Sequence, residues 1–268
     1  MNDSDAARLT ERAEKAAATP RHLLEPFFKD SAKVVLVALA RNPNLLEPDL
    51  LRLLERKDLP AEVLREIAAH KEAARSYSVK LALARHPKTP RVISLPILKF
   101  LYLFDLLRVV QTPAAPADVK MAAEEKILAK AETLTRGEKI TLARRASGRV
   151  VAGLLATEDG DLIQAGLDNP FLTEAHILKL LALETLPPIV VEAVAHHPKW
   201  SLRYHVRLAL LRNPRTPFER VLAFLPDMTV ADLQEICLDR RMPEPVRHYI
   251  LAHCAERLSK PSRLAPGS

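Results

Sequence analysis

Three histidines that lie close together are the first residues whose side chains could do chemistry. His196, His197 and His205 carry imidazole groups, which bind zinc in many proteins. A zinc site needs four protein ligands, or three and a water molecule, and no acid or cysteine stands at ligand spacing beside these histidines. We therefore expect no metal site.

The two cysteines and the few glycines are the next candidate marks of an enzyme. A catalytic thiol needs a neighbouring base and a lowered pKa, and the sequence offers neither to Cys237 or Cys254. Among the six glycines, residues 147–153 (SGRVVAG) come closest to a phosphate loop or a nucleophile elbow and match neither. We expect buried structural thiols, no catalytic residue, no cofactor and no enzymatic activity.

Six basic residues form the candidate binding site. They lie in two stretches, residues 76–91 and 199–217, which contain lysine and arginine but no acid. On a surface such residues can bind an anionic partner, whereas at helix C-termini they neutralise the helix dipole at about 0.3–1 kcal/mol each. Both interpretations remain open for Lys80, Arg85, Lys88, Arg207, Arg212 and Arg215.

The two basic stretches belong to a long internal repeat, which tells us what positions them. SVKLALARHPKTP at residues 78–90 returns as HVRLALLRNPRTP at residues 205–217, so that Pro87 matches Pro214. This spacing of 127 residues is called the repeat offset below. It holds without a gap upstream, where Asn42 matches Asn169. A repeat this long indicates a tandem duplication.

The duplication predicts the domain organisation. We expect a first half at residues 1–131, a second half at residues 132–258 that packs on the first, and a disordered tail at residues 259–268. Superposition of residues 34–128 on residues 161–255 should then pair the helices one for one.

The elements that carry these residues are predicted to be short helices. The chain has 21 prolines against 6 glycines, and proline suits the first turn of a helix and the residues beyond its end. Residues 48–58 (PDLLRLLERKD) place leucines on one broad face and charges on the other, and no stretch alternates as a strand does. The fold is expected to be all-α, with these leucines in its core: Leu51, Leu53, Leu54, Leu81, Leu83, Leu178, Leu180, Leu181, Leu208 and Leu210.

Acids that occur in both halves are expected to cap helices. Glu47 matches Glu174 and Asp105 matches Asp232, and each precedes an apolar helical run. A carboxylate at that place accepts hydrogen bonds from the free N–H groups of the first turn. We expect a boundary role of the same kind for His70 and His197.

Charge and hydropathy limit the location and the partners. A net charge of +7 and an isoelectric point near 9.5 permit an anionic partner without requiring one. No apolar run reaches the roughly 20 residues that cross a membrane, and the charged N-terminal stretch is not a signal peptide. We expect a cytoplasmic protein that is a monomer and does not bind membranes.

Residues 39–70 (LARNPNLLEPDLLRLLERKDLPAEVLREIAAH) and residues 193–217 (AVAHHPKWSLRYHVRLALLRNPRTP) resemble the leucine-rich repeat variant and the wider HEAT-like α-solenoids. Units of that kind carry an Ala, Asn, Pro triplet, an apolar helix and a proline-initiated helix. The resemblance implies a right-handed α-solenoid of HEAT-like helical repeats, here in two tandem copies, with an extended binding surface. Some similar proteins add a cysteine-rich iron–sulfur segment, but no cysteine precedes Cys237, so a cluster is not implied.

These observations together predict a binding protein. The leading hypothesis is a non-enzymatic helical-repeat scaffold that binds another protein through an extended surface. The alternative is a HEAT-like protein that binds nucleic acid through its backbone phosphates, and a degenerate HEAT-like DNA-modifying enzyme comes third.

Overall fold

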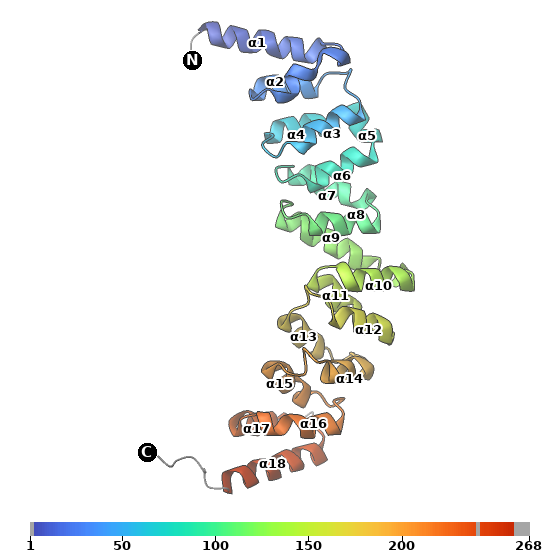
Figure 1. The fold of residues 1–268 in the computed structure, drawn as a ribbon, viewed down its shortest axis with the longest axis vertical. Coiled ribbons are helices and arrows are strands. Elements are labelled where there is room, and N and C mark those ends of the chain that lie inside the picture. Colours follow the sequence, from blue (N-terminus) through green and yellow to red (C-terminus); the bar gives the residue numbers. More distant parts are fainter. Residues whose placement is uncertain (1–2, 240–241, 260–268) are drawn as a thin grey trace. The chain divides into compact units, whose positions relative to one another are not determined.

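The computed structural model describes residues 3–239 and 242–259 (Figure 1). Its described residues form 18 α-helices and five short 3-10 helices, and none of them lies in a strand. The prediction of an all-α fold is therefore confirmed. Ser259, which was predicted to begin a disordered tail, is the last residue of a helix, and the rest of that segment, residues 260–268, lies outside the described residues.

The chain divides into two compact units, Met1–Lys130 and Ala131–Ser268, which are called the first and the second unit below. In the first unit the helices follow one another in chain order from α1 to α9 (Figure 1). They are α1 (Asp3–Ala18), η1 (Arg21–Leu23), η2 (Glu25–Lys29), α2 (Lys33–Ala40), α3 (Glu47–Glu55), α4 (Ala61–Ala69), α5 (Lys71–Arg75), α6 (Tyr77–Arg85), α7 (Arg91–Ile97), η3 (Leu98–Phe100), α8 (Leu103–Gln111) and α9 (Ala117–Ala129).

The second unit contains η4 and α10 to α18. Its elements are η4 (Ala131–Thr133), α10 (Arg136–Arg145), α11 (Gly148–Leu154), α12 (Gly160–Leu167), α13 (Glu174–Leu181), α14 (Pro188–His196), α15 (Tyr204–Arg212), α16 (Phe218–Phe224), η5 (Leu225–Asp227), α17 (Val230–Ile236) and α18 (Glu244–Ser259). From α2 onward, every α-helix of the first unit except α5 begins at a residue that the repeat offset matches to the first residue of a helix in the second unit.

Helix α5 is the exception to the predicted one-for-one pairing, which is wrong at this place. Its counterpart, residues 198–202, forms turns. The sequence KEAAR of α5 consists of strong helix formers, whereas PKWSL contains Trp200, whose buried indole N–H donates to the Leu167 carbonyl at 2.9 Å. Burial of that ring fixes the segment in another conformation.

Within each unit, helices pack on helices two places along the chain. In the first unit α2 packs on α4, α6 on α8 and α7 on α9. In the second unit α10 packs on α12, α11 on α13, α12 on α14, α13 on α15 and α15 on α17. The core therefore lies between successive helix pairs, where each apolar stripe is covered by its neighbours.

The ten leucines predicted for the core divide into two groups. Leu53, Leu54, Leu83, Leu180, Leu181 and Leu210 are buried. Leu51, Leu81, Leu178 and Leu208 are only half-buried, because they lie at the edge of the apolar face rather than at its centre. Both groups recur at the repeat offset, so the two units bury the same positions.

Polar side chains in the turns join each helix pair to the preceding one. The Asn42 side chain is fully buried; its Nδ2 donates to the carbonyls of Ala16 (2.8 Å) and Thr19 (2.9 Å), and its Oδ1 accepts from the backbone N–H of Asn44. Asn169 makes the same three bonds, to the Ala143 and Ala146 carbonyls and from the Phe171 N–H. Since buried polar groups must be paired, these bonds fix the turns in both units.

Histidines occupy the equivalent place in other turns. His70 caps α5 by accepting from the Glu72 N–H, and its Nε2 lies 3.1 Å from the Asn42 carbonyl oxygen. His86 accepts from the Lys88 N–H and contacts the Arg56 carbonyl oxygen at 2.8 Å. Burial lowers the pKa of His86 below the ordinary value, although the bond to Arg56 opposes this effect.

Candidate functional site

The six predicted basic residues lie on two helices and in the turns that follow them. Lys80 and Arg207 lie inside α6 and α15, and Arg85 and Arg212 are the last residues of those helices. Lys88 and Arg215 lie in the turns that follow. In each unit, therefore, two of the three residues lie at or just beyond the C-terminal end of the helix, whereas Lys80 and Arg207 lie nearer its start.

The turn residues bind carbonyl groups of the preceding helix pair. The Lys88 Nζ donates to the Asp58 carbonyl at 3.0 Å. The Arg215 Nη1 donates to the Glu184 carbonyl at 2.8 Å and also to that of Leu186. Both side chains thus supply donors to carbonyl oxygens that no helix satisfies.

The helix residues also have partners inside the chain. Lys80 donates to the Ala74 carbonyl at 2.6 Å, and Arg207 donates to the Ser201 carbonyl at the same distance. The Arg85 Nε donates to Thr112 Oγ1 at 2.9 Å, and Arg212 lies 2.8 Å from the carboxylate of Glu235. A phosphate would therefore share or displace an existing contact at all six positions.

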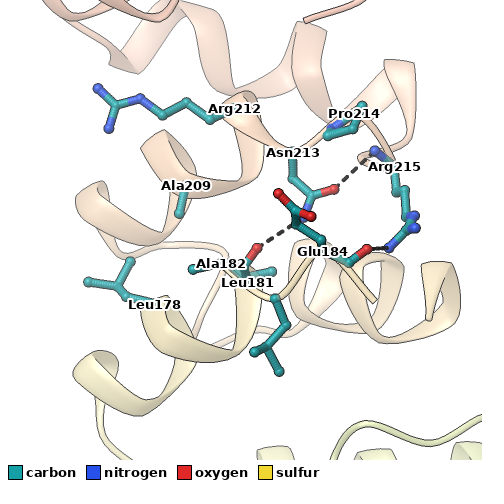
Figure 2. A pocket seen from close by; sticks show the side chains of 10 residues that line it. Leu178, Leu181, Ala182, Glu184, Ala209, Arg212, Asn213, Pro214 and Arg215 are labelled. Carbon is teal, nitrogen blue, oxygen red and sulfur yellow. Dashed lines mark hydrogen bonds between the residues drawn. The ribbon is translucent and has the colours of Figure 1, made fainter. Parts of the chain in front are cut away.

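A groove of about 350 Å³ lies beside two of these residues in the second unit. Figure 2 shows Leu178 and Ala209 on one side and Glu184, Asn213 and Arg215 on the other. Asn213 donates to the Leu181 carbonyl at 3.2 Å and accepts from the Arg215 N–H, so the polar wall is held together internally. The charges around the groove are of both signs, because Glu184 lines it together with Arg212 and Arg215.

A second surface, in the first unit, combines exposed rings with lysines. Phe100 at the end of η3 is 56% exposed, and Tyr102, just before α8, is 72% exposed. The ammonium groups of Lys80 and Lys99 lie 5.5 and 5.0 Å from the centre of the Phe100 ring. We call Tyr77, Lys80, Lys99, Phe100 and Tyr102 the aromatic surface.

Tyr77 holds this surface in place from α6. Its ring centre lies 5.0 Å from that of Tyr102, its hydroxyl donates to Asp105 at 2.6 Å, and the same oxygen accepts from the Tyr102 N–H at 3.0 Å. Burial and the neighbouring carboxylate raise the pKa of Tyr77 above its ordinary value. The hydroxyl therefore remains protonated and keeps Tyr102 at the start of α8.

The second unit has the same hydrogen-bonded tyrosine, called the tyrosine anchor, but lacks the two exposed rings. Tyr204 donates its hydroxyl to Asp232 and accepts from the backbone N–H of Thr229 at 3.3 Å. Thr229 stands where the first unit has Tyr102, and Asp227 stands where it has Phe100. Arg207, the counterpart of Lys80, forms an ion pair with Asp227.

The acids predicted as caps all lie in first turns, but their side-chain contacts are with other side chains. Asp105 and Asp232 accept from tyrosines, and Glu174 lies 3.1 Å from the imidazole of His205. Glu47 is the first residue of α3, whose N-terminal N–H groups are favourable for a negative charge. The prediction is therefore right about the position and incomplete about the partners.

Sequence reasoning missed the aromatic surface. The candidate residues taken from the sequence were basic, and the single tryptophan near the second basic stretch, Trp200, is buried. A signal was present in residues 99–104 (KFLYLF), where an aromatic residue stands at every second position. Such spacing does not fit a helical stripe and indicates that some of the rings face solvent.

The other residues considered for chemistry have structural surroundings. Cys237 and Cys254 are both buried, and burial raises the pKa of both thiols. Within residues 3–239 and 242–259, no three His, Cys, Asp or Glu side chains gather as a metal site would require. None of the helices in the same residues combines the length and the apolar character that crossing a membrane demands.

Comparison with known proteins provides no functional assignment, so the assignment rests on the surfaces described above. No family model, curated protein or solved structure that was compared with this chain matches it.

Proposed function

We propose that this chain is a cytoplasmic helical-repeat scaffold that binds another protein and catalyses no reaction. The proposal includes a right-handed α-solenoid built from two tandem copies. Its architectural part is supported by helices that pack two places apart and by helix starts that recur at the repeat offset. The buried bonds of Asn42 and Asn169, which join partners at that same offset, support it further.

The aromatic surface is the observation that favours protein binding. Exposed aromatic side chains are unfavourable in water, and Tyr and Phe are enriched where proteins contact one another. Tyr102 cannot turn its backbone inward, because its N–H is bonded to the Tyr77 hydroxyl. The rings are thus presented on a framework already fixed before a partner arrives, which reduces the entropy cost of binding.

Binding of nucleic acid through phosphates is the second candidate. The six basic residues favour it by charge, but each of their side chains already contacts a carbonyl, a hydroxyl or a carboxylate of this chain. Those contacts lie within the chain and need no ligand. The protein hypothesis is therefore the better supported one.

An affinity capture from cell lysate, with and without nuclease, tests the proposal when a matched pair of variants is included. The first variant replaces Phe100 and Tyr102 by alanine, and the control replaces Asp227 and Thr229, at the same positions of the second unit, by alanine. We expect a protein that resists nuclease, is lost with the first variant and is retained with the control. Capture that nuclease abolishes, or that ignores both variants, would reject a protein-binding role for this surface.

A further inference from the structure

We propose that the aromatic surface binds an acidic segment of the partner protein, with an apolar side chain on Phe100 and Tyr102 and a carboxylate between Lys80 and Lys99. This inference rests on the proposed function and specifies the chemistry of the partner.

The charges beside Phe100 are unbalanced. Both ammonium groups lie over this one ring, at 5.5 and 5.0 Å from its centre. Among the described residues, no carboxylate lies within ion-pair distance of Lys80 or Lys99. Two cations that share a ring repel one another, so an added negative charge would be favourable there.

The second unit shows what occupies the equivalent place. Arg207, the counterpart of Lys80, donates to the carbonyl of Ser201 as Lys80 does to that of Ala74. Its Nη1 pairs with the carboxylate of Asp227, which stands at the position of Phe100. The chain therefore contains a template in which a cation at this position takes a carboxylate, and the first unit lacks the carboxylate.

The geometry of α6 places the apolar contacts beside the charges. Tyr77 and Lys80 are three residues apart on one helix and so share a face. Tyr77 contacts Tyr102 and Lys80 contacts Phe100, which puts both exposed rings along that face. A peptide that crosses the start of α6 would meet rings and ammonium groups in turn.

A single-stranded nucleic acid could also use rings and lysines, since bases stack on aromatic side chains. The internal template favours a protein, because Asp227 presents a carboxylate at this position. The test therefore includes an oligonucleotide.

The inference is tested by fluorescence anisotropy with the full chain and a labelled peptide, Glu-Glu-Leu-Glu-Glu-Leu-Glu-Glu. A charge-reversed peptide with Lys for Glu, a peptide with Ser for Leu and an oligothymidine serve as comparisons. We expect the acidic peptide to bind at least about tenfold more tightly than each of the others at low salt. The preference over the Lys peptide should shrink as salt is added.

Two variants locate the binding. Lys99→Glu should lower the affinity for the acidic peptide about tenfold. In Phe100→Ala the acidic peptide and the Ser peptide should bind with the same reduced affinity. Lys179→Glu, a lysine on α13 in the second unit, is the control and should have no effect. Thermal unfolding of each variant checks that the fold is intact.

The outcomes separate the two proposals. Equal binding of the Lys and Glu peptides, or no binding of either, overturns the acidic chemistry, while the captured protein partner decides the proposed function independently. Tighter binding of the oligothymidine, lost in Phe100→Ala, overturns both. Loss of acidic-peptide binding in Lys179→Glu but not in Lys99→Glu shows that the site is elsewhere and also overturns the inference.

Discussion

The two units have equivalent interiors, each within its own helices, and they differ at the aromatic surface. Asn42 and Asn169 bind the same set of backbone groups at the repeat offset, and the tyrosine anchors of α6 and α15 are alike. Phe100 and Asp227, at matching positions, have opposite chemistry: one is an exposed ring under two cations and the other is an ion-pair partner. Bonds between helix pairs must be kept for the fold, whereas an exposed position can change without loss of the core.

The largest expected effect tests whether the two interiors are equivalent. Leu83→Ala and Leu210→Ala should each lower the free energy of unfolding by about 2–5 kcal/mol, because both side chains are buried. Leu81→Ala and Leu208→Ala should cost about 1–2 kcal/mol, since these leucines are only half-buried. Urea unfolding measures all four. A larger loss from Leu81→Ala than from Leu83→Ala would contradict the burial pattern.

Removal of the buried asparagines tests the polar framework. Asn42→Ala and Asn169→Ala each delete three hydrogen bonds from a buried side chain to backbone groups, so each should cost about 2–3 kcal/mol. Urea unfolding is again the measurement. If one variant is neutral while the other is destabilising, the two frameworks are not equivalent.

One pair of contacting residues differs between the units, and we expect its replacement to affect stability more in the second unit than in the first. Arg21 forms an ion pair with Asp49 in the first unit, and the matching positions hold Gly148 and His176. A Cβ on Gly148 would clash with the His176 ring and with the Phe171 carbonyl oxygen. Gly148→Ala should therefore cost about 1–3 kcal/mol, and Arg21→Ala should cost less, because the Arg21 side chain is exposed.

Differential scanning calorimetry of the two variants checks this asymmetry. Equal melting temperatures for Gly148→Ala and the unmodified chain would mean that the imidazole does not occupy the space that glycine leaves.

The smallest expected effect concerns pH. Burial lowers the pKa of His86, so the unfolded chain takes up a proton more readily than the folded chain. The stability that neutral His86 contributes is fully present above the unfolded value of about 6.5 and falls as the pH drops below it. His86→Asn, which installs the residue of the second unit, should remove this part of the acid dependence.

Unfolding in urea at several pH values measures the effect, with His22→Asn, an exposed histidine, as the control. An acid dependence that is unchanged in His86→Asn but altered in His22→Asn would contradict the assignment.

The repeated positions were the predictable part of the structure. Leucine spacing and proline positions predicted an all-α fold, and residues kept at the repeat offset, such as Asn42 and His70, proved to make bonds that the fold requires. Helix periodicity gives a broad apolar face and does not separate its centre from its edge, so Leu81 and Leu208 were expected to be as buried as Leu83.

The candidate site was less predictable, for two physical reasons. The partners of Lys88 and Arg215 are carbonyls of residues far earlier in the chain, which come close only through tertiary packing. The candidate residues of the sequence analysis recur as the same kind of residue in both copies, whereas Phe100 is matched by Asp227 and was therefore not among them. A comparison restricted to positions that both units keep cannot detect a surface that is present in only one of them.

The first unit, on this account, has a binding surface because it lacks the carboxylate that the second unit has. The most direct test is the affinity of the acidic peptide for Phe100→Asp, which places the residue of the second unit beside Lys80. We predict that thermal stability is unchanged, because the new carboxylate pairs with Lys80 as Asp227 pairs with Arg207, and that peptide affinity falls at least about tenfold. An affinity equal to that of the unmodified chain would contradict the account.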